Sequence, residues 1–195
     1  MTTATEDVRT ELTVRLSRDV DAAFPELVSS YQQAVYTTVL RLSGRQVDAA
    51  DLAAEAFLRA YQALRRYPPE RVRQLKLRPW LITIALNLWR NQVRTATRRP
   101  AHVSLDSSPE PPAGSGGPEE HLRRRELRTT VAGLLAQLPE TQRLAVVLRH
   151  VVGLAYSEIA TILHCPEGTA KSHVSRGLQH LRALTTDTDL QEELS

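Results

Sequence analysis

The amino-acid sequence predicts an all-α protein made of two small helical domains joined by a flexible Pro/Gly-rich linker. Apolar residues recur at helical spacing in both halves of the chain, and a helix-turn-helix pattern ends the second half. Between the two halves lies a stretch whose composition cannot form a packed core. At 195 residues, each half is long enough to bury a core of its own.

The composition favours a protein of a reducing compartment. A single cysteine, Cys165, excludes an internal disulfide framework. Residues 1–7 lack the apolar core of a signal peptide, and no apolar run is long enough to span a bilayer. We therefore expect a cytoplasmic protein without membrane insertion. Because the formal net charge is only +3, contact with nucleic acid has to come from local basic patches.

The first domain is predicted to occupy residues 19–99. Residues 1–18 mix charged residues and threonine with few large apolar side chains, and we expect them to be disordered. An amphipathic helix follows from Asp19 and stops at Ser43-Gly44. Its apolar positions are Phe24, Leu27, Val28, Tyr31, Val35, Val39 and Leu42.

A second helix starts near Asp48 or Asp51, either of which can cap it, and Tyr67-Pro68-Pro69 ends it. Its buried stripe is predicted to contain Leu52, Ala56, Phe57, Ala60, Tyr61 and Leu64. Residues 70–78 carry several cations against one acid, and we interpret them as a loop or short turn outside the core.

The third predicted helix spans about residues 79–98. We expect its inward positions to be Trp80, Leu81, Ile84, Ala85 and Leu88. Another face carries a polar stripe without any carboxylate, formed by Thr83, Asn87, Arg90, Asn91 and Arg94. Beside a basic loop and two tryptophans, this stripe is typical of a surface that meets bases and phosphates. The structural alternative is an ordinary solvated helix face.

Residues 100–120 are predicted to form the linker, because eight of the nineteen residues from Pro100 to Pro118 are Pro or Gly. The second domain follows over residues 121–186, and residues 187–195 form a polar, acidic tail. We expect a helix over 121–138 with Leu127, Val131, Leu134, Leu135 and Leu138 inward. Pro139 starts the next helix, whose apolar positions are Leu144, Val147, Leu148 and Val151.

Residues 153–178 are typical of a helix-turn-helix. Ile159, Ile162 and Leu163 share one stripe of the first helix; Ala170, Val174, Leu178 and Leu181 share one stripe of the second. His164 lies at the reversal, and Pro166 can open the second helix. The outward face of that helix has cations and small hydroxyls but no acid, which suits the major groove of DNA. Its members are Thr169, Lys171, Ser172, His173, Ser175, Arg176 and Gln179.

In this order, the motifs resemble those of the extracytoplasmic-function (ECF) class of bacterial sigma factors, the sigma-70 family of RNA polymerase initiation subunits. The likeness runs from about Asp19 to Leu184 and leaves out the linker. The segment Asp48–Ala60 is similar to the acidic segment that binds the clamp helices of the largest polymerase subunit. The segment Arg78–Asn87 is similar to the start of the helix that reads the −10 element. Leu138–Arg143 and the helix-turn-helix are similar to the domain that binds the −35 element and the flap of the second-largest subunit.

The resemblance implies a sigma factor that binds core RNA polymerase, recognises both promoter elements and assists strand opening. It implies polymerase contacts for Asp48, Asp51, Leu52, Glu55, Phe57 and Arg59. It implies −10 contacts for Arg71, Arg73, Lys76, Trp80, Asn87, Arg90, Asn91 and Arg94. It implies −35 contacts for Thr169, Lys171, Ser172, His173, Ser175 and Arg176. The implied partners are core polymerase, duplex promoter DNA, the melted non-template strand and an anti-sigma protein; no catalytic residue, metal or cofactor is expected.

Two residues depart from the family pattern in ways that bear on stability. Ala155 stands where a helix-capping Ser or Thr is frequent, which should cost roughly 1 kcal/mol unless Gly153 or Ser157 substitutes. His164 replaces a frequent glycine at the turn, and histidine tolerates a positive φ better than most residues.

Other classes of function remain as alternatives. A dimeric helix-turn-helix regulator would bind a palindromic site without polymerase, but it would need a second exposed apolar stripe, which the first half lacks. An enzyme would have to use His164-Cys165, which has no orienting third group. A metal site from Cys165, His173 and His180 is disfavoured because the two histidines are seven residues apart.

Overall fold

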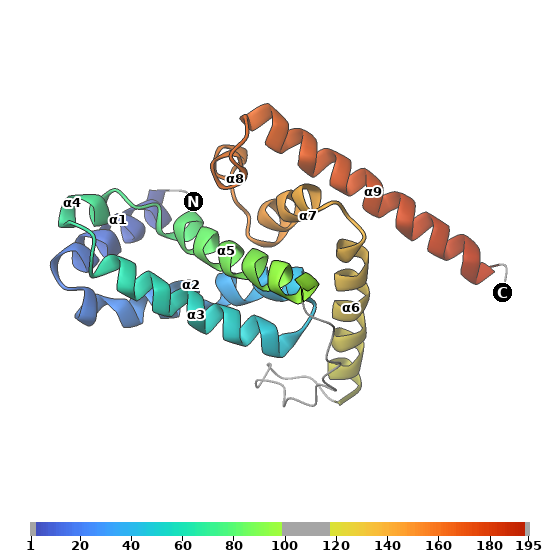
Figure 1. Ribbon diagram of the computed structural model, residues 1–195, viewed down its shortest axis with the longest axis horizontal. Coiled ribbons are helices and arrows are strands. Elements are labelled where there is room, and N and C mark those ends of the chain that lie inside the picture. Colours follow the sequence, from blue (N-terminus) through green and yellow to red (C-terminus); the bar gives the residue numbers. More distant parts are fainter. Residues whose placement is uncertain (1–2, 99–117, 194–195) are drawn as a thin grey trace. The chain divides into compact units, whose positions relative to one another are not determined.

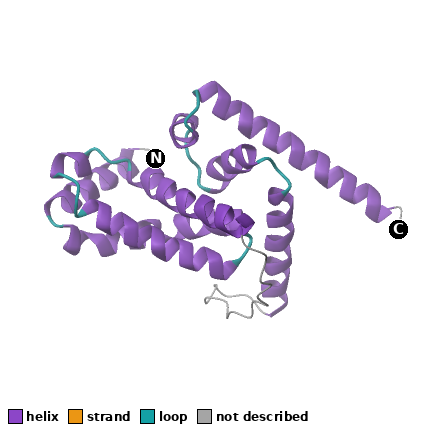
Figure 2. Cartoon of the chain, viewed as in Figure 1, coloured by secondary structure: helices purple, strands orange, loops and turns teal. Residues whose placement is uncertain are grey.

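The computed structural model describes residues 3–98 and 118–193, and all regular elements in these two stretches are helices (Figure 2). They form two compact units (Figure 1). One unit holds the described residues up to 39 and those from 50 to 98; the other holds residues 40–49 and those from 118 onward. Within the described part of the chain, no helix is long and apolar enough to cross a membrane.

The N-terminal segment is a helix, so the prediction of disorder for residues 1–18 is wrong where the structure describes it. Helix α1 spans Thr3–Arg18. Leu12 and Leu16 lie one turn apart on it and are only 3% and 0% exposed. Two buried leucines suffice here because α1 does not stand alone but packs on the short helix α4 (Pro69–Arg73).

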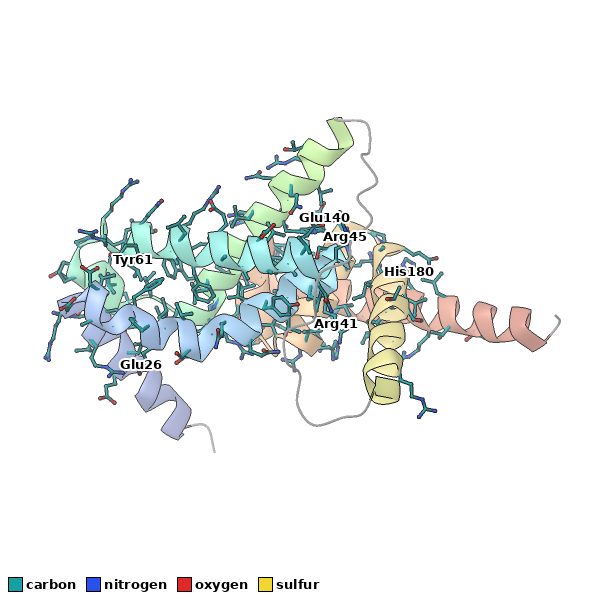
Figure 3. All side chains as sticks on the ribbon, turned by 90° about the horizontal axis from the view of Figure 1, so that it is seen from below. Glu26, Arg41, Arg45, Tyr61, Glu140 and His180 are labelled. Carbon is teal, nitrogen blue, oxygen red and sulfur yellow. The ribbon has the colours of Figure 1, made fainter. Side chains whose placement is uncertain are left out.

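Helices α2 (Val20–Ser43) and α3 (Gln46–Leu64) form the predicted hairpin. The Phe24 ring packs edge-on against the Tyr61 ring at 5.1 Å between centroids. The Tyr61 hydroxyl donates a hydrogen bond to Asp21 Oδ1 at 2.7 Å, and this bond raises the pKa of Tyr61. Tyr61 therefore lies beside the start of α2, toward the same end of the first unit as Glu26 (Figure 3).

The segment predicted as a surface loop contributes to the core instead. It contains a short helix, α4 (Pro69–Arg73), and the start of α5 (Leu77–Arg98). Val72 and Leu77 are only 1% and 4% exposed, so the expectation that residues 70–78 lie outside the core is wrong. The four cations dominate the composition of this segment, but the two apolar side chains between them decide which face turns inward.

Helix α5 buries a wider apolar arc than its predicted stripe. Leu81, Ala85 and Leu88 are buried as expected, whereas Trp80 and Ile84 are only half-buried. The structure also buries three residues outside the prediction, which are Ile82, Leu86 and Trp89. A helix packed on neighbours from two sides needs more than one apolar row, which explains the difference.

The second unit contains α6 (Pro118–Ala136), α7 (Glu140–Val146), a π-helical turn (Val147–Val151), α8 (Tyr156–Leu163) and α9 (Glu167–Glu193). Helix α9 packs against α7 and α8 and continues through most of the segment predicted as a tail. Leu135 and Leu138 are buried as predicted, and Val131 and Leu134 are half-buried. The inward prediction is wrong for Leu127 and Val151, which are 64% and 39% exposed.

Candidate nucleic-acid interface

The second unit carries a helix-turn-helix in which α9 lies very close to α7. Ala170 and Val174 are 0% and 2% exposed, and Gly177 is buried on the same side of α9. A Cβ atom on Gly177 would lie only 2.6 Å from Val146 Cγ2 and 3.3 Å from the Gln142 carbonyl oxygen. Small residues on α9 therefore allow this close approach.

The turn between α8 and α9 has the predicted geometry. His164 adopts φ 52° and ψ 46°, the left-handed conformation that histidine tolerates better than most residues. The Pro166 carbonyl accepts hydrogen bonds from the N–H groups of Thr169 and Ala170 at 2.9 and 3.0 Å. Helix α9 consequently starts directly after Pro166 and presents its polar face from the first turn.

The start of α8 lacks a side-chain cap. Ala155 occupies the N-cap position with an extended backbone, and no side chain there accepts a hydrogen bond from the first turn. Neither Gly153 nor Ser157 substitutes. The Glu158 carboxylate instead accepts the Ala155 N–H at 2.9 Å, which satisfies only one of the exposed donors.

The predicted DNA-facing residues of α9 lie on its surface. Lys171, Ser172, Ser175 and Arg176 are exposed, and Thr169 and His173 are half-buried. Among the described residues, His173 Nδ1 is buried without a hydrogen-bond partner. A DNA ligand of His173 would therefore meet Nε2. The face combines two fixed positive charges with small hydroxyls, as a helix lying in a major groove requires.

The first unit presents a stack of flat groups beside α4. The Arg71 guanidinium carbon lies 3.8 Å from the centre of the Tyr67 ring, and the Tyr67 and Trp80 ring centres are 6.2 Å apart. Both rings are half-buried and Arg71 is exposed. Such partly exposed aromatic and guanidinium planes are the groups on which single-stranded bases stack. We call residues 67–80 the stacking segment.

Tyr67 was missing from the site residues that the sequence predicted. The sequence placed it at the end of a helix and at the start of the basic loop over residues 67–78 that we expected to meet the melted strand, but did not single it out as a contact residue. Its contact with Arg71 could have been suspected from the four-residue spacing, but its contact with Trp80 depends on how α5 packs.

The predicted polar stripe of α5 also lies at the surface. Asn87, Asn91 and Arg94 are exposed, and Thr83 and Arg90 are half-buried. The Arg94 guanidinium donates a hydrogen bond to Asn91 Oδ1, one turn away. The stripe is therefore available to a ligand, as the nucleic-acid interpretation requires.

Two other basic residues of the stacking segment, Lys76 and Arg73, differ in their hydrogen bonding. Lys76 is exposed. Arg73 is also exposed, but its Nε donates a hydrogen bond to Ser17 Oγ of α1 at 3.0 Å. The structure therefore ties one predicted DNA-binding arginine to the protein itself.

The predicted polymerase-binding residues divide between surface and core. Asp51 is exposed. The Asp48 carboxylate forms an ion pair with the Arg45 guanidinium, with Oδ2 3.4 Å from Nη1. The Glu55 and Arg59 side chains form an ion pair at 2.7 Å. Leu52 and Phe57 are buried, at 8% and 9% exposure, so a direct contact through them is not supported. Leu58, which the sequence prediction did not include, is 52% exposed beside Arg59.

The described residues contain no cluster of His, Cys, Asp and Glu side chains that could hold a metal ion. Each unit presents one polar face. The second unit presents the outward face of α9, and the first unit presents the α5 stripe with the stacking segment.

Comparison with known proteins agrees with this division. The model of Sigma-70 region 2 matches residues 27–99, and the model of Sigma-70 region 4 matches residues 128–181. The chain is 33% identical over 181 residues to the RNA polymerase sigma-H factor of Pseudomonas aeruginosa, covering 88% of this chain and 91% of that protein. It is 35% identical over 174 residues to the ECF RNA polymerase sigma-E factor of Escherichia coli K12, covering 85% and 87%.

A solved structure gives the same result. The sigma factor RpoE of Bartonella quintana, in complex with the anti-sigma factor NepR, matches with a TM-score of 0.62 and 25% identity over 84% of this chain and 96% of that one. Both region models, the full-length relatives and the fold thus agree. The chain belongs to the ECF class of the sigma-70 family of RNA polymerase sigma factors.

Proposed function

We propose that this protein binds core RNA polymerase and directs promoter-specific initiation, with α9 on the −35 element and the α5 stripe and stacking segment on the −10 element. The observation that carries this assignment is the difference between the two polar faces. The face on α9 suits an intact duplex, whereas the face on the first unit has the flat groups that bind unpaired bases.

At the −35 element, α9 would lie in the major groove. Lys171 and Arg176 supply charge for phosphates or guanine edges, and Ser172 and Ser175 permit close approach. The Ser172 hydroxyl donates to the Gly168 carbonyl at 2.9 Å, which leaves its oxygen free to accept from a base or water. His173 contributes through Nε2, because Nδ1 is buried.

At the −10 element, the protein has to offset the loss of base stacking when the strands separate. Unstacking costs a few kcal/mol per step, and stacking of a base on an aromatic ring returns about 1–3 kcal/mol. Tyr67 and Trp80 offer such rings. Asn87 and Asn91 offer amides for base edges, and Arg90 and Arg94 offer charge for the backbone. The chain needs no catalytic residue for this role, since phosphoryl transfer belongs to the polymerase core.

For polymerase we propose the exposed face of α3, with Asp51, Glu55 and Arg59 around Leu58. Clamp helices of the largest subunit would meet this face, and the flap of the second-largest subunit would meet the second unit. The solved complex of the Bartonella quintana protein with NepR supports an anti-sigma protein as a further partner.

In vitro transcription tests the proposal. Core polymerase should start RNA synthesis at defined sites on genomic fragments only when this chain is present, and core polymerase alone is the control. If no promoter-dependent start forms, the proposed function fails. If the isolated chain instead binds a palindromic site tightly as a dimer, the helix-turn-helix regulator is correct.

A further inference from the structure

We propose that α1 positions the stacking segment and that Arg73 serves promoter opening through α1, as a positioning residue, rather than by touching DNA. This inference rests on the proposed role of the stacking segment in binding the melted strand. Helix α1 precedes residue 27, where the match to the Sigma-70 region 2 model begins.

The stacking segment needs outside support because α4 is too short to be stable alone. Helix α4 has only five residues, and isolated helices of one or two turns are unstable in water. Its one buried residue is Val72. Helix α1 packs on α4 and contributes the buried Leu12 and Leu16. The position of α4, and so of Tyr67 and Arg71 around it, therefore depends on α1.

Two consecutive hydrogen bonds also connect α4 to α1. The Ser17 hydroxyl donates to the Val14 carbonyl at 2.7 Å, so its proton is turned back into α1. The oxygen is then available to accept from Arg73 Nε at 3.0 Å. Helix α1 also contacts α2 through an exposed ion pair between Arg15 and Glu26. Arg73 thus links α4 to α1, which in turn contacts α2.

A surface cleft of about 290 Å³ lies beside α4, lined by residues of α1, the start of α2, the end of α3 and α4. Its lining includes Leu16 and Ser17 on one side and Tyr67, Pro69 and Val72 on the other. Beside this cleft, the contact of α1 with α4 and the hydrogen bond between Arg73 and Ser17 hold α4 in place. Loss of that bond should let the stacking segment move without unfolding the unit.

A double-mutant cycle in the polymerase holoenzyme tests this inference. The variants are Ser17→Ala, Arg73→Ala and the double variant, and the readout is the affinity for a single-stranded −10 non-template oligonucleotide. One lost hydrogen bond of this kind corresponds to roughly a fivefold weaker affinity. We expect both single variants and the double variant to lose affinity alike, because they remove the same interaction. Ser17→Thr, which keeps the hydroxyl, should restore binding.

Ser29→Ala is the matched control. Ser29 is an exposed serine whose hydroxyl bonds the carbonyl of its own helix, at Pro25, and it should not affect strand affinity. If Arg73→Ala weakens binding equally in the Ser17→Ala background, or lowers the salt dependence by about one phosphate contact, Arg73 touches DNA and the inference is overturned. An unchanged affinity in Ser17→Ala also overturns it.

Hydrogen exchange of the free chain separates this inference from the proposed function. Ser17→Ala and Arg73→Ala should speed amide exchange in α4 and at its C-cap, at residues such as Val72 and Gln74, while α9 stays unchanged. Unchanged exchange in α4 would overturn the positioning role. If the wild-type holoenzyme does not bind the oligonucleotide at all, the proposed function fails, and the exchange data still decide whether α1 positions α4.

Discussion

The two helices that carry the polar faces, α5 and α9, are held in the protein by opposite means. Helix α5 buries large side chains on a wide arc, including Ile82, Leu86 and Trp89. Helix α9 is held by small ones, with Ala170, Val174 and Gly177 against its neighbours. The first arrangement fills a broad core; the second brings two helix backbones close together.

This difference fits the two roles that we propose for these helices. A helix that enters a groove of duplex DNA has to be held rigidly by its own domain, and close packing on α7 holds α9 in this way. A surface that binds an opened strand needs flat groups in several directions, and Tyr67, Arg71 and Trp80 come from three different parts of the chain fold. The second unit should therefore be sensitive to added atoms, and the first to the loss of rings.

The largest expected effect is that of Gly177→Ala on the second unit. The new Cβ would lie 2.6 Å from Val146 Cγ2, and overpacking of this kind costs about 1–3 kcal/mol. Helix propensity returns about 1 kcal/mol, which leaves a net loss of up to about 2 kcal/mol. Urea unfolding followed by circular dichroism should show the loss. Both tryptophans lie in the first unit, so the tryptophan fluorescence transition should not move.

Gly168→Ala is the control for this substitution, because no atom lies within 4 Å of its new Cβ. It should leave stability unchanged or raise it by up to about 1 kcal/mol. A Gly177→Ala chain that gained as much stability as the Gly168→Ala chain would show that α9 is not closely packed. A joint shift of fluorescence and circular dichroism would show that the two units do not unfold separately.

The next effect concerns the stacking segment. Tyr67→Leu removes the ring between Arg71 and Trp80, and one lost base stack of about 1–3 kcal/mol should weaken single-strand binding by the holoenzyme roughly tenfold. Tyr67→Phe keeps the ring and should bind nearly as the wild type does. Fluorescence anisotropy with a −10 oligonucleotide measures both. Equal losses in the two variants would mean that the hydroxyl, not the ring, is what matters.

The smallest expected effect is a gain in the stability of the second unit. Ala155→Ser supplies the missing cap of α8, and an N-cap hydroxyl contributes about 0.5–2 kcal/mol. The denaturation midpoint of the second unit should rise. Ala183→Ser, at an exposed position within α9, is the control and should lower stability by a few tenths of a kcal/mol. A midpoint that falls with Ala155→Ser would show that Glu158 already satisfies the start of the helix.

Helical periodicity predicted the long elements well. Helices α2, α3, α5 and α8 begin and end close to the predicted residues, because each has a regular apolar stripe. Helix α9 begins as predicted after Pro166 but runs on to Glu193, into the segment predicted as a tail. Helix α1 escaped prediction because Leu12 and Leu16 are its main apolar anchors, and only the packing of α4 makes them sufficient. The prediction for residues 70–78 failed for the same reason.

The candidate site was predictable where a residue's helix face decided its exposure. The α9 face and the α5 stripe followed from spacing alone. Leu52 and Phe57 were assigned both to a buried stripe by periodicity and to polymerase contact by resemblance, and the structure agrees with the periodicity. The tilted contact of the Tyr67 ring with the Trp80 ring depends on how α5 packs, and the hydrogen bond of Arg73 to Ser17 joins distant parts of the chain. No spacing rule indicates either contact.

The central claim is that α9 binds the intact duplex and α5 serves its opening. The most direct test compares Arg176→Ala and Asn87→Ala holoenzymes in closed-complex affinity and in the rate of strand opening, with Arg182→Ala, exposed on α9 beyond the proposed face, as control. We predict that Arg176→Ala weakens closed-complex binding about tenfold and lowers its salt slope by about one, while opening is unchanged. Asn87→Ala should slow opening and leave closed-complex binding intact. Equal losses in both steps for both variants would contradict the account.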